Sequence, residues 1–199
     1  MVVVAVGAHP DDIEFGCYGA LAKLSVDHDV YLFIFTAGEI TAPRIERIKE
    51  AEESGKLIGA KVKFLDYPDG AIPVNGEIIG RFIEEIKALN PQIVFTLYPE
   101  DTHQDHRAVS QITLSSCRHV PKILFYETPH TKSNFAPNYY VDITDYFEFK
   151  EKALKCHQTQ KNKPYLHIDE IRGLNQYRAN KVYLPGRLFE AFFLYRLIS

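Results

Sequence analysis

The chain opens with VVVAVG (residues 2–7), and AHPDD (residues 8–12) follows directly. An apolar, β-branched run bounded by Gly and Pro is typical of a strand buried on both faces of a parallel sheet. The polar residues begin where such a strand leaves the core. Because open α/β sheets bind ligands beyond the carboxyl ends of their strands, we expect a functional site at residues 9–12.

Strand-like and helix-like segments alternate along the first two thirds of the chain. Helical stretches of ten or more residues between strands imply right-handed βαβ crossovers and a parallel sheet covered on both faces. This alternation predicts a Rossmann-like, doubly wound α/β fold with strand order 3-2-1-4-5. The expected strands are residues 2–7, 29–36, 62–67, 92–97 and 122–127, and the expected helices are residues 16–25, 43–59, 79–89 and 108–119.

The last third of the sequence is less regular. With 199 residues, 46% of them hydrophobic, and with neither an internal repeat nor a linker, we expect a single domain over residues 1–199 and a mainly parallel sheet. The strand partners in this part cannot be assigned from the sequence. The expected elements are a polar, aromatic loop at 129–137, strands at 139–144 and 189–197, and helices at 145–158 and 168–182, the second interrupted by Gly173.

Composition excludes several classes of partner. A net charge of -3 with scattered Lys and Arg gives no basic face for nucleic acid or for an anionic membrane. No apolar run approaches the roughly 18 residues of a membrane helix, and nothing before Val2 resembles a charged leader, so we expect a cytoplasmic protein. Cys17, Cys117 and Cys156 lack disulfide or metal spacing, and we interpret them, Cys17 included, as reduced packing thiols.

Metal-ligand residue types are concentrated in two segments, HPDD (residues 9–12) after the first strand and HQDH (residues 103–106) after the fourth. In strand order 3-2-1-4-5 the first and fourth strands are neighbours. The chain reverses direction between them, and their carboxyl ends form a crevice. The two segments are therefore expected to face each other across that crevice and to form a metal site there.

The spacing within the two segments indicates a catalytic metal. His9 and Asp12 are at i and i+3 at the start of a helix, and His106 approaches from the opposite wall. Three N and O ligands leave a fourth position for water, which is the pattern of a catalytic Zn²⁺, whereas a structural site would favour cysteines. We expect one Zn²⁺ or another divalent cation.

The remaining residues of the two segments suggest roles in catalysis. Asp11 is free to take a proton from the activated water, and His103 is placed to polarise a carbonyl oxygen or to protonate a leaving amine. Asp105 is expected to orient the imidazole of His103. Simpler interpretations stay open, since Asp11, Asp12 and Asp105 are also typical helix caps and His103 is an alternative ligand.

The motifs AHPDDIEFG (residues 8–16) and THQDH (residues 102–106) resemble the two signatures of the PIG-L/LmbE-like family of zinc-dependent N-deacetylases. This family removes acetyl groups from N-acetylglucosamine-type sugars and their conjugates. The resemblance extends along nearly the whole chain. It includes TAGE at 36–39, RIKEA at 47–51, LIG at 57–59, NFAPN at 134–138, VDIT at 141–144, HQTQ at 157–160 and EAF at 190–192.

The resemblance implies a role for individual residues. Arg47 matches a position that holds substrate in some members, although a solvated helix arginine is an equally good interpretation. Many members have YAEAF where this chain has LFEAF (residues 188–192), so a contact made by that tyrosine is missing. The roles of His157 and of the loop at 130–137 stay undecided. The resemblance implies His9, Asp12 and His106 as metal ligands, Asp11 as general base, and His103 with Asp105 as stabilisers of the oxyanion and of the departing amine.

We therefore expect a zinc-dependent hydrolase that deacetylates an N-acetylated amino sugar or a small conjugate of one. Members of the family often form homo-oligomers, which the resemblance implies here too. One alternative is a zinc amidase for another small amide conjugate. The other is a non-catalytic module that binds a sugar or nucleotide phosphate at residues 7–9. The missing G-x-G-x-x-G spacing and the carboxylates at that position disfavour the module.

Overall fold

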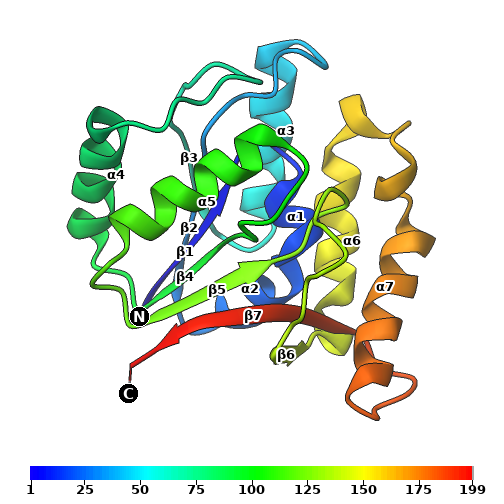
Figure 1. The fold of residues 1–199 in the computed structure, drawn as a ribbon. Coiled ribbons are helices and arrows are strands. Elements are labelled where there is room, and N and C mark those ends of the chain that lie inside the picture. The colour runs from blue at the N-terminus through cyan, green and yellow to red at the C-terminus, as the bar shows by residue number, and fades with distance from the viewer. Residues whose placement is uncertain (199) are drawn as a thin grey trace.

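Five parallel strands form the centre of the sheet in the computed structural model, which describes residues 1–198. The predicted strand order is confirmed, and the fold is a Rossmann-like α/β sheet with helices on both faces (Figure 1). The central strands are β3 (Lys61–Phe64), β2 (Asp29–Ile34), β1 (Val2–Gly7), β4 (Ile93–Leu97) and β5 (Lys122–Tyr126), in this order across the sheet.

Two further strands extend the sheet beyond β5. Strand β7 (Phe189–Leu197) pairs antiparallel with β5, and β6 (Tyr139–Asp142) pairs antiparallel with β7 at the edge. Phe192 is opposite Tyr126 on one side and Tyr139 on the other. The C-terminal strand is thus inserted between two earlier ones.

The helices form two layers (Figure 1). Helices α4 and α5 pack against each other on one face, while α1, α2 and α3 contact α6 on the other. Helix α7 lies beside β7. The bounds are α1 (Asp12–Gly16), α2 (Tyr18–Leu24), α3 (Arg44–Lys56), α4 (Gly76–Leu89), α5 (Gln104–Ser116), α6 (Phe147–Cys156) and α7 (Ile168–Lys181), with 3-10 turns η1 (Thr144–Tyr146), η2 (Gln158–Gln160) and η3 (Pro164–Leu166).

Three helices differ from the expectation. The first begins at Asp12 rather than residue 16 and breaks at Cys17, whose backbone φ of -147° is not helical. Helix α5 begins at Gln104, because the ring of His103 accepts a hydrogen bond from the backbone of Asp105 and caps the helix. The expected interruption at Gly173 is wrong. Glycine costs about 1 kcal/mol in a helix, which packing of the rest of α7 offsets.

The core lies between the sheet and its two helical layers. Val3, Val4 and Val6 of β1 are fully buried, as the opening of the chain predicts. Cys17 is also fully buried among core side chains, which supports a packing role and gives it no access to a substrate. Within residues 1–198, every helix is too short or too polar to cross a membrane.

Candidate metal centre

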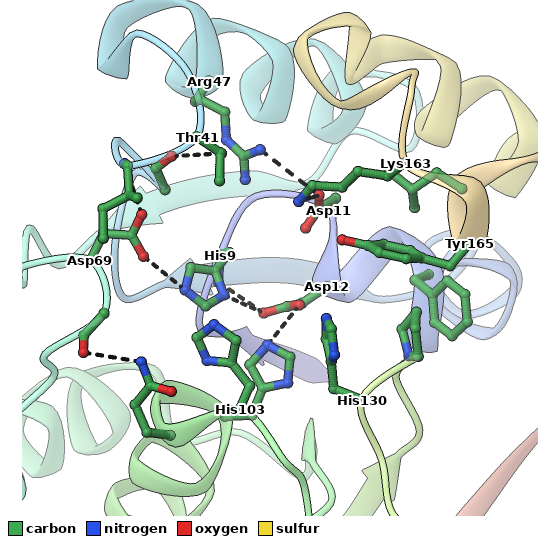
Figure 2. A pocket seen from close by; sticks show the side chains of 18 residues that line it. His9, Asp11, Asp12, Thr41, Arg47, Asp69, His103, His130, Lys163 and Tyr165 are labelled. Carbon is green, nitrogen blue, oxygen red and sulfur yellow. Dashed lines mark hydrogen bonds and ion pairs between the residues drawn. The ribbon is translucent and has the colours of Figure 1, made fainter.

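The two predicted segments meet at the carboxyl ends of β1 and β4. These strands are parallel neighbours, with Val4 opposite Val94, so the loops that follow them leave the sheet at the same edge. The first loop leads into α1 and the second into α5, and side chains of both line a pocket of about 180 Å³ (Figure 2). The crevice expected from the topology is therefore present.

The turn after β1 is held by Asp12. Its Oδ2 accepts hydrogen bonds from the backbone nitrogens of Ala8 at 3.0 Å and of His9 at 2.8 Å. Asp11 has a left-handed backbone with φ 105°, which is costly for a residue with a side chain and indicates a functional constraint. The side chain of Asp11 makes no capping hydrogen bond to α1. Helix capping therefore does not explain Asp11.

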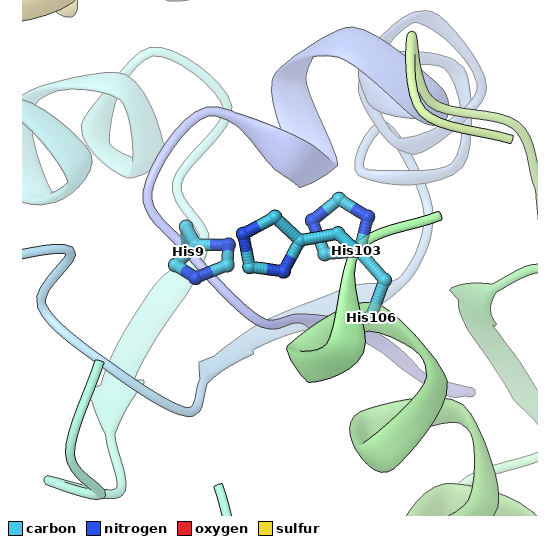
Figure 3. Close-up of side chains that lie close together, drawn as sticks. All are labelled: His9, His103 and His106. Atoms are coloured by element: carbon cyan, nitrogen blue, oxygen red, sulfur yellow. The ribbon is translucent and has the colours of Figure 1, made fainter. Parts of the chain in front are cut away.

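Asp12 lies between two histidines. Its Oδ2 is 3.5 Å from Nδ1 of His9, and its Oδ1 is 3.3 Å from Nε2 of His106. The ring nitrogens of His9, His103 and His106 also lie within 4.8 Å of one another (Figure 3). The predicted ligands and the alternative ligand His103 are thus gathered at one point. Imidazole nitrogens with a carboxylate oxygen are a donor set that suits Zn²⁺ and related divalent ions.

Carboxylates contact the far nitrogens of both predicted histidine ligands. Nε2 of His9 is 3.1 Å from Asp69 and 3.3 Å from Asp105, while Nδ1 of His106 is 3.1 Å from Asp101. Such partners fix the orientation of a metal-ligating imidazole. The sequence analysis missed Asp69 and Asp101. The only signals were the turn at 68–70 and the position of Asp101 just before the second motif.

The expected contact between Asp105 and the ring of His103 is wrong. The carboxylate of Asp105 accepts hydrogen bonds from the backbone nitrogens of Gly70 at 2.7 Å and Ile72 at 3.2 Å, and it faces His9. Its backbone nitrogen, not its side chain, contacts Nδ1 of His103 at 3.2 Å. The first turn of α5 directs this side chain toward the 70–72 segment. Asp105 therefore positions His9.

The charges of this cluster favour bound positive charge. Burial disfavours protonated His9, but the hydrogen bonds that its ring donates to Asp105, Asp12 and Asp69 hold the pKa of His9 well above its usual value. Burial also acts to lower the pKa of His106. The attraction of Asp12 and Asp101 outweighs this effect and raises the pKa of His106 to about 9. Although burial acts to raise the pKa of Asp12, His106 and His9 hold it well below its usual value. A bound divalent cation would supply the positive charge that protonated His9 and His106 otherwise provide to these carboxylates.

Asp11 forms ion pairs with two cations but accepts no hydrogen bond from either. Its Oδ2 is 3.9 Å from Nη1 of Arg47 and 3.7 Å from Nζ of Lys163 (Figure 2). Among the described residues this buried oxygen has no hydrogen-bond partner. Burial raises the pKa of Asp11, and the attraction of Arg47 and Lys163 limits the rise. A buried carboxylate oxygen without a hydrogen bond, beside a candidate metal site, has the properties expected of a general base.

Arg47 is not a solvated helix arginine. Only 1% of it is exposed, and its Nη2 donates to the carbonyl oxygen of Pro10 at 2.6 Å. Gly38, with φ +68°, allows this packing, since a Cβ there would lie 2.7 Å from Nη2. Nη1 is buried and has no hydrogen-bond partner in the part of the chain that the structure describes, and Arg47 lines the pocket. A hydrogen-bond donor is thus available to a ligand.

Other residues complete the surroundings of the pocket. His157 is buried with its Nε2 3.2 Å from Glu14, behind the pocket rather than in it. His130, from the loop whose role was undecided, lines the pocket. Lys163 and Tyr165 line it too, and the sequence analysis missed both because they lie far from either motif.

The sheet and the histidine–carboxylate cluster define a Rossmann-like protein with a candidate metal centre at its switch point. The family model described as "PIG-L: GlcNAc-PI de-N-acetylase" matches residues 4–117. The chain belongs to the PIG-L family of deacetylases.

Named relatives and a solved structure agree with this membership. The uncharacterized deacetylase YaiS of Escherichia coli is 34% identical over 79% of this chain and 90% of its own length. The diacetylchitobiose deacetylase of Thermococcus kodakarensis is 29% identical over 79% of this chain and 69% of its own. The N,N'-diacetylchitobiose deacetylase of Pyrococcus horikoshii superposes with a TM-score of 0.84 at 25% identity, over 97% of this chain and 83% of that chain.

Proposed function

We propose that this protein removes the acetyl group from an N-acetylated amino sugar of the N-acetylglucosamine type, or from a small conjugate of one, with the help of Zn²⁺. The observation that carries the proposal is the buried carboxylate of Asp11, whose Oδ2 has no hydrogen-bond partner among the described residues, beside the cluster of His9, Asp12 and His106. The deacetylase names of the relatives support the acetyl group, and diacetylchitobiose supports the amino sugar.

His9, Asp12 and His106 would hold the cation, because they offer two imidazole nitrogens and a carboxylate. Carboxylates orient both rings, and a backbone hydrogen bond orients Asp12. When bound, such a cation is a Lewis acid toward a carbonyl oxygen and lowers the pKa of water toward ~7. Two imidazoles and a carboxylate are typical ligands of Zn²⁺, which is therefore the ion we propose first. The same donor set is also compatible with other divalent ions.

Asp11 moves the proton. It accepts a proton from water as the water oxygen attacks the acetamide carbon, and it returns that proton to the amine nitrogen when the C–N bond breaks. The products are acetate and a free amine. The raised pKa of Asp11, which follows from its burial, favours both transfers because it brings the carboxyl group closer to neutral pH.

His103 stabilises the charge that develops on the carbonyl oxygen. Its Nδ1 accepts a hydrogen bond from the backbone of Asp105, which leaves the proton on Nε2. Burial, and then repulsion from His9 and His106, lowers the pKa of His103 and favours the neutral ring. A neutral ring with a proton on Nε2 is a hydrogen-bond donor rather than a metal ligand. This favours the oxyanion role over the alternative of a third histidine ligand.

Arg47 is proposed to hold the substrate. Its buried Nη1 lacks a hydrogen-bond partner among the described residues and is directed toward Asp11 at the pocket wall. A sugar hydroxyl or a carbonyl oxygen accepts such a hydrogen bond. By contrast, a phosphate-binding module at residues 7–9 has little support, because Asp12 already occupies the backbone nitrogens of Ala8 and His9.

The test is product analysis with zinc-loaded protein. N-acetylglucosamine, its methyl glycoside and N,N'-diacetylchitobiose are incubated with the protein, and acetate and primary amine are quantified in parallel. We expect equal amounts of both, and no release by the Asp12→Ala variant. Protein that contains stoichiometric zinc but releases no acetate from any of these sugars contradicts the proposal. Amine release confined to amides of other acids identifies an amidase of a different class.

We also infer a cytoplasmic location and a homo-oligomeric state. The first rests on the free cysteines Cys17, Cys117 and Cys156, and the second on the resemblance to the family. Light scattering of the purified protein measures the second, and a monomeric mass contradicts it.

A further inference from the structure

A second cavity, of about 440 Å³, adjoins the metal pocket. The two share Phe15, Pro129 and Tyr165, so these three side chains lie at the boundary between them. The rest of its wall comes from η3 and the start of α7. We call this cavity the apolar annex and define it by the residues that line it, which are Phe15, Pro129, Pro164, Tyr165, His167, Glu170 and Ile171.

The lining of the annex is mostly carbon. Phe15 and Ile171 belong to one buried apolar cluster, and two prolines and the ring of Tyr165 cover the other sides. No Lys or Arg of residues 1–198 lines it, and its polar side chains are those of Tyr165, His167 and Glu170. The metal pocket differs, because Arg47 and Lys163 line it. The annex therefore disfavours a phosphate or carboxylate and offers few partners to sugar hydroxyls.

Tyr165 joins the two spaces. Figure 2 shows its hydroxyl directed toward Asp11, with its ring near His130. The centroids of the two rings are 5.7 Å apart. A ligand whose acetamide group reaches the metal cluster would thus continue past the Tyr165 ring into the annex. An aromatic ring on this path favours an apolar or aromatic group.

We propose that the annex holds an uncharged, apolar aglycone, aryl or alkyl, of the acetylated sugar. This inference rests on the proposed function and narrows its substrate class to glycosides with an apolar aglycone. A second sugar or an anionic headgroup is the less favoured aglycone, because the annex offers no Lys or Arg among the described residues and has few polar side chains, those of Tyr165, His167 and Glu170.

Binding is measured so that turnover does not enter the result. Zinc-loaded Asp11→Asn protein is titrated by calorimetry with phenyl and with methyl N-acetyl-β-glucosaminide. We expect the phenyl glycoside to bind at least about tenfold more tightly, because its ring is removed from water in the annex. The Pro164→Glu variant in the same background places a carboxylate in the annex and should bring the two Kd values within about twofold.

Gln176→Glu is the matched control, because it adds the same charge at an exposed position of α7 that does not line the annex. It should keep the tenfold preference. Glu170→Lys is a second, surface variant, and it should improve binding of the 4-carboxyphenyl glycoside at least about fivefold by charge attraction.

Equal Kd values for the phenyl and methyl glycosides, or a preference that survives Pro164→Glu, overturn the inference. The inference is also overturned if neither glycoside binds, because the annex then holds no sugar ligand. That result is expected, for example, if a second copy of the chain covers the annex. A retained preference in a protein whose wild type releases no acetate contradicts the proposed function alone.

Discussion

The carboxylate of Asp101 lies 3.1 Å from Nδ1 of His106, and both side chains are buried. Asp101 also accepts a hydrogen bond from Thr128 at 2.8 Å, and its other oxygen accepts one from the backbone of His103 at 2.8 Å. One carboxylate thus orients a proposed metal ligand and the proposed oxyanion donor together. Carboxylates behind metal-binding histidines have this role in many metalloenzymes.

Asp101→Asn should weaken zinc binding by roughly 10- to 100-fold, because the amide no longer fixes the orientation and charge of His106. Competition with a chromogenic chelator measures the Kd. Asp27→Asn, at an exposed position, is the control. Unchanged zinc affinity in Asp101→Asn would mean that His106 is not a ligand or needs no support.

Zinc binding should release protons near neutral pH. In the metal-free protein the pKa values of His9 and His106 lie above the usual value near 6.5, that of His106 at about 9. Both rings hold protons at pH 7 and must lose them to bind a metal. We expect about two protons released per zinc at pH 7, measured by calorimetry in buffers of different ionisation enthalpy.

The same shifts set the pH dependence of the metal-free protein. Because the folded pKa of His106 lies above its unfolded value, its stabilisation is full below about pH 6.5 and is lost as the pH rises through about 9. Zinc affinity should rise over the same interval. Affinity that is constant from pH 6.5 to 9 would show that the carboxylates do not hold protons on these rings.

Lys163→Met should move the acidic limb of kcat/KM to higher pH. The ammonium group lies 3.7 Å from Asp11 and favours its charged form, so its removal raises the pKa of the base further. The pH profile of the metal-loaded enzyme is the measurement. Lys161→Met removes an exposed cation nearby and should leave the limb in place. If the acidic limb of kcat/KM stays at the same pH in Lys163→Met, the ionisation seen in the profile is not that of Asp11.

His157→Leu should lower the free energy of unfolding by about 3 kcal/mol, because it leaves the buried Glu14 carboxylate without its charged partner. Urea denaturation measures the loss. The double variant with Glu14→Gln should regain part of it, since the buried charge is then absent. A loss in the double variant equal to the sum of the two single losses would contradict this pairing.

The strand order and the position of the crevice followed from the sequence because they depend on strong local signals. A run such as residues 2–7 has few alternatives to a buried strand, and the alternation with helices fixes the parallel order. Between β5 and β6, the position of β7 depends on long-range pairing that leaves no local pattern. Gly173 misled the helix prediction because packing of α7 outweighs a single residue's propensity.

The site followed from the sequence only where its residues lie in the two motifs. Residues 9–12 and 103–106 were placed together by the topology. Asp69 and Lys163 come from turns far from either motif, and their side chains reach the site only through the tertiary fold. The prediction that the side chain of Asp105 contacts His103 was wrong for the same reason. His103 is its neighbour in the sequence, whereas His9 is its neighbour in space.

The most direct test of the central claim compares wild type and Asp11→Asn for zinc content and for acetate release from an N-acetylglucosamine glycoside. We predict equal, stoichiometric zinc in both proteins and a rate at least about 100-fold lower in the variant, because only the proton acceptor is lost. Acetate release by Asp11→Asn at the wild-type rate, with its zinc retained, would contradict the assignment of Asp11 as the base.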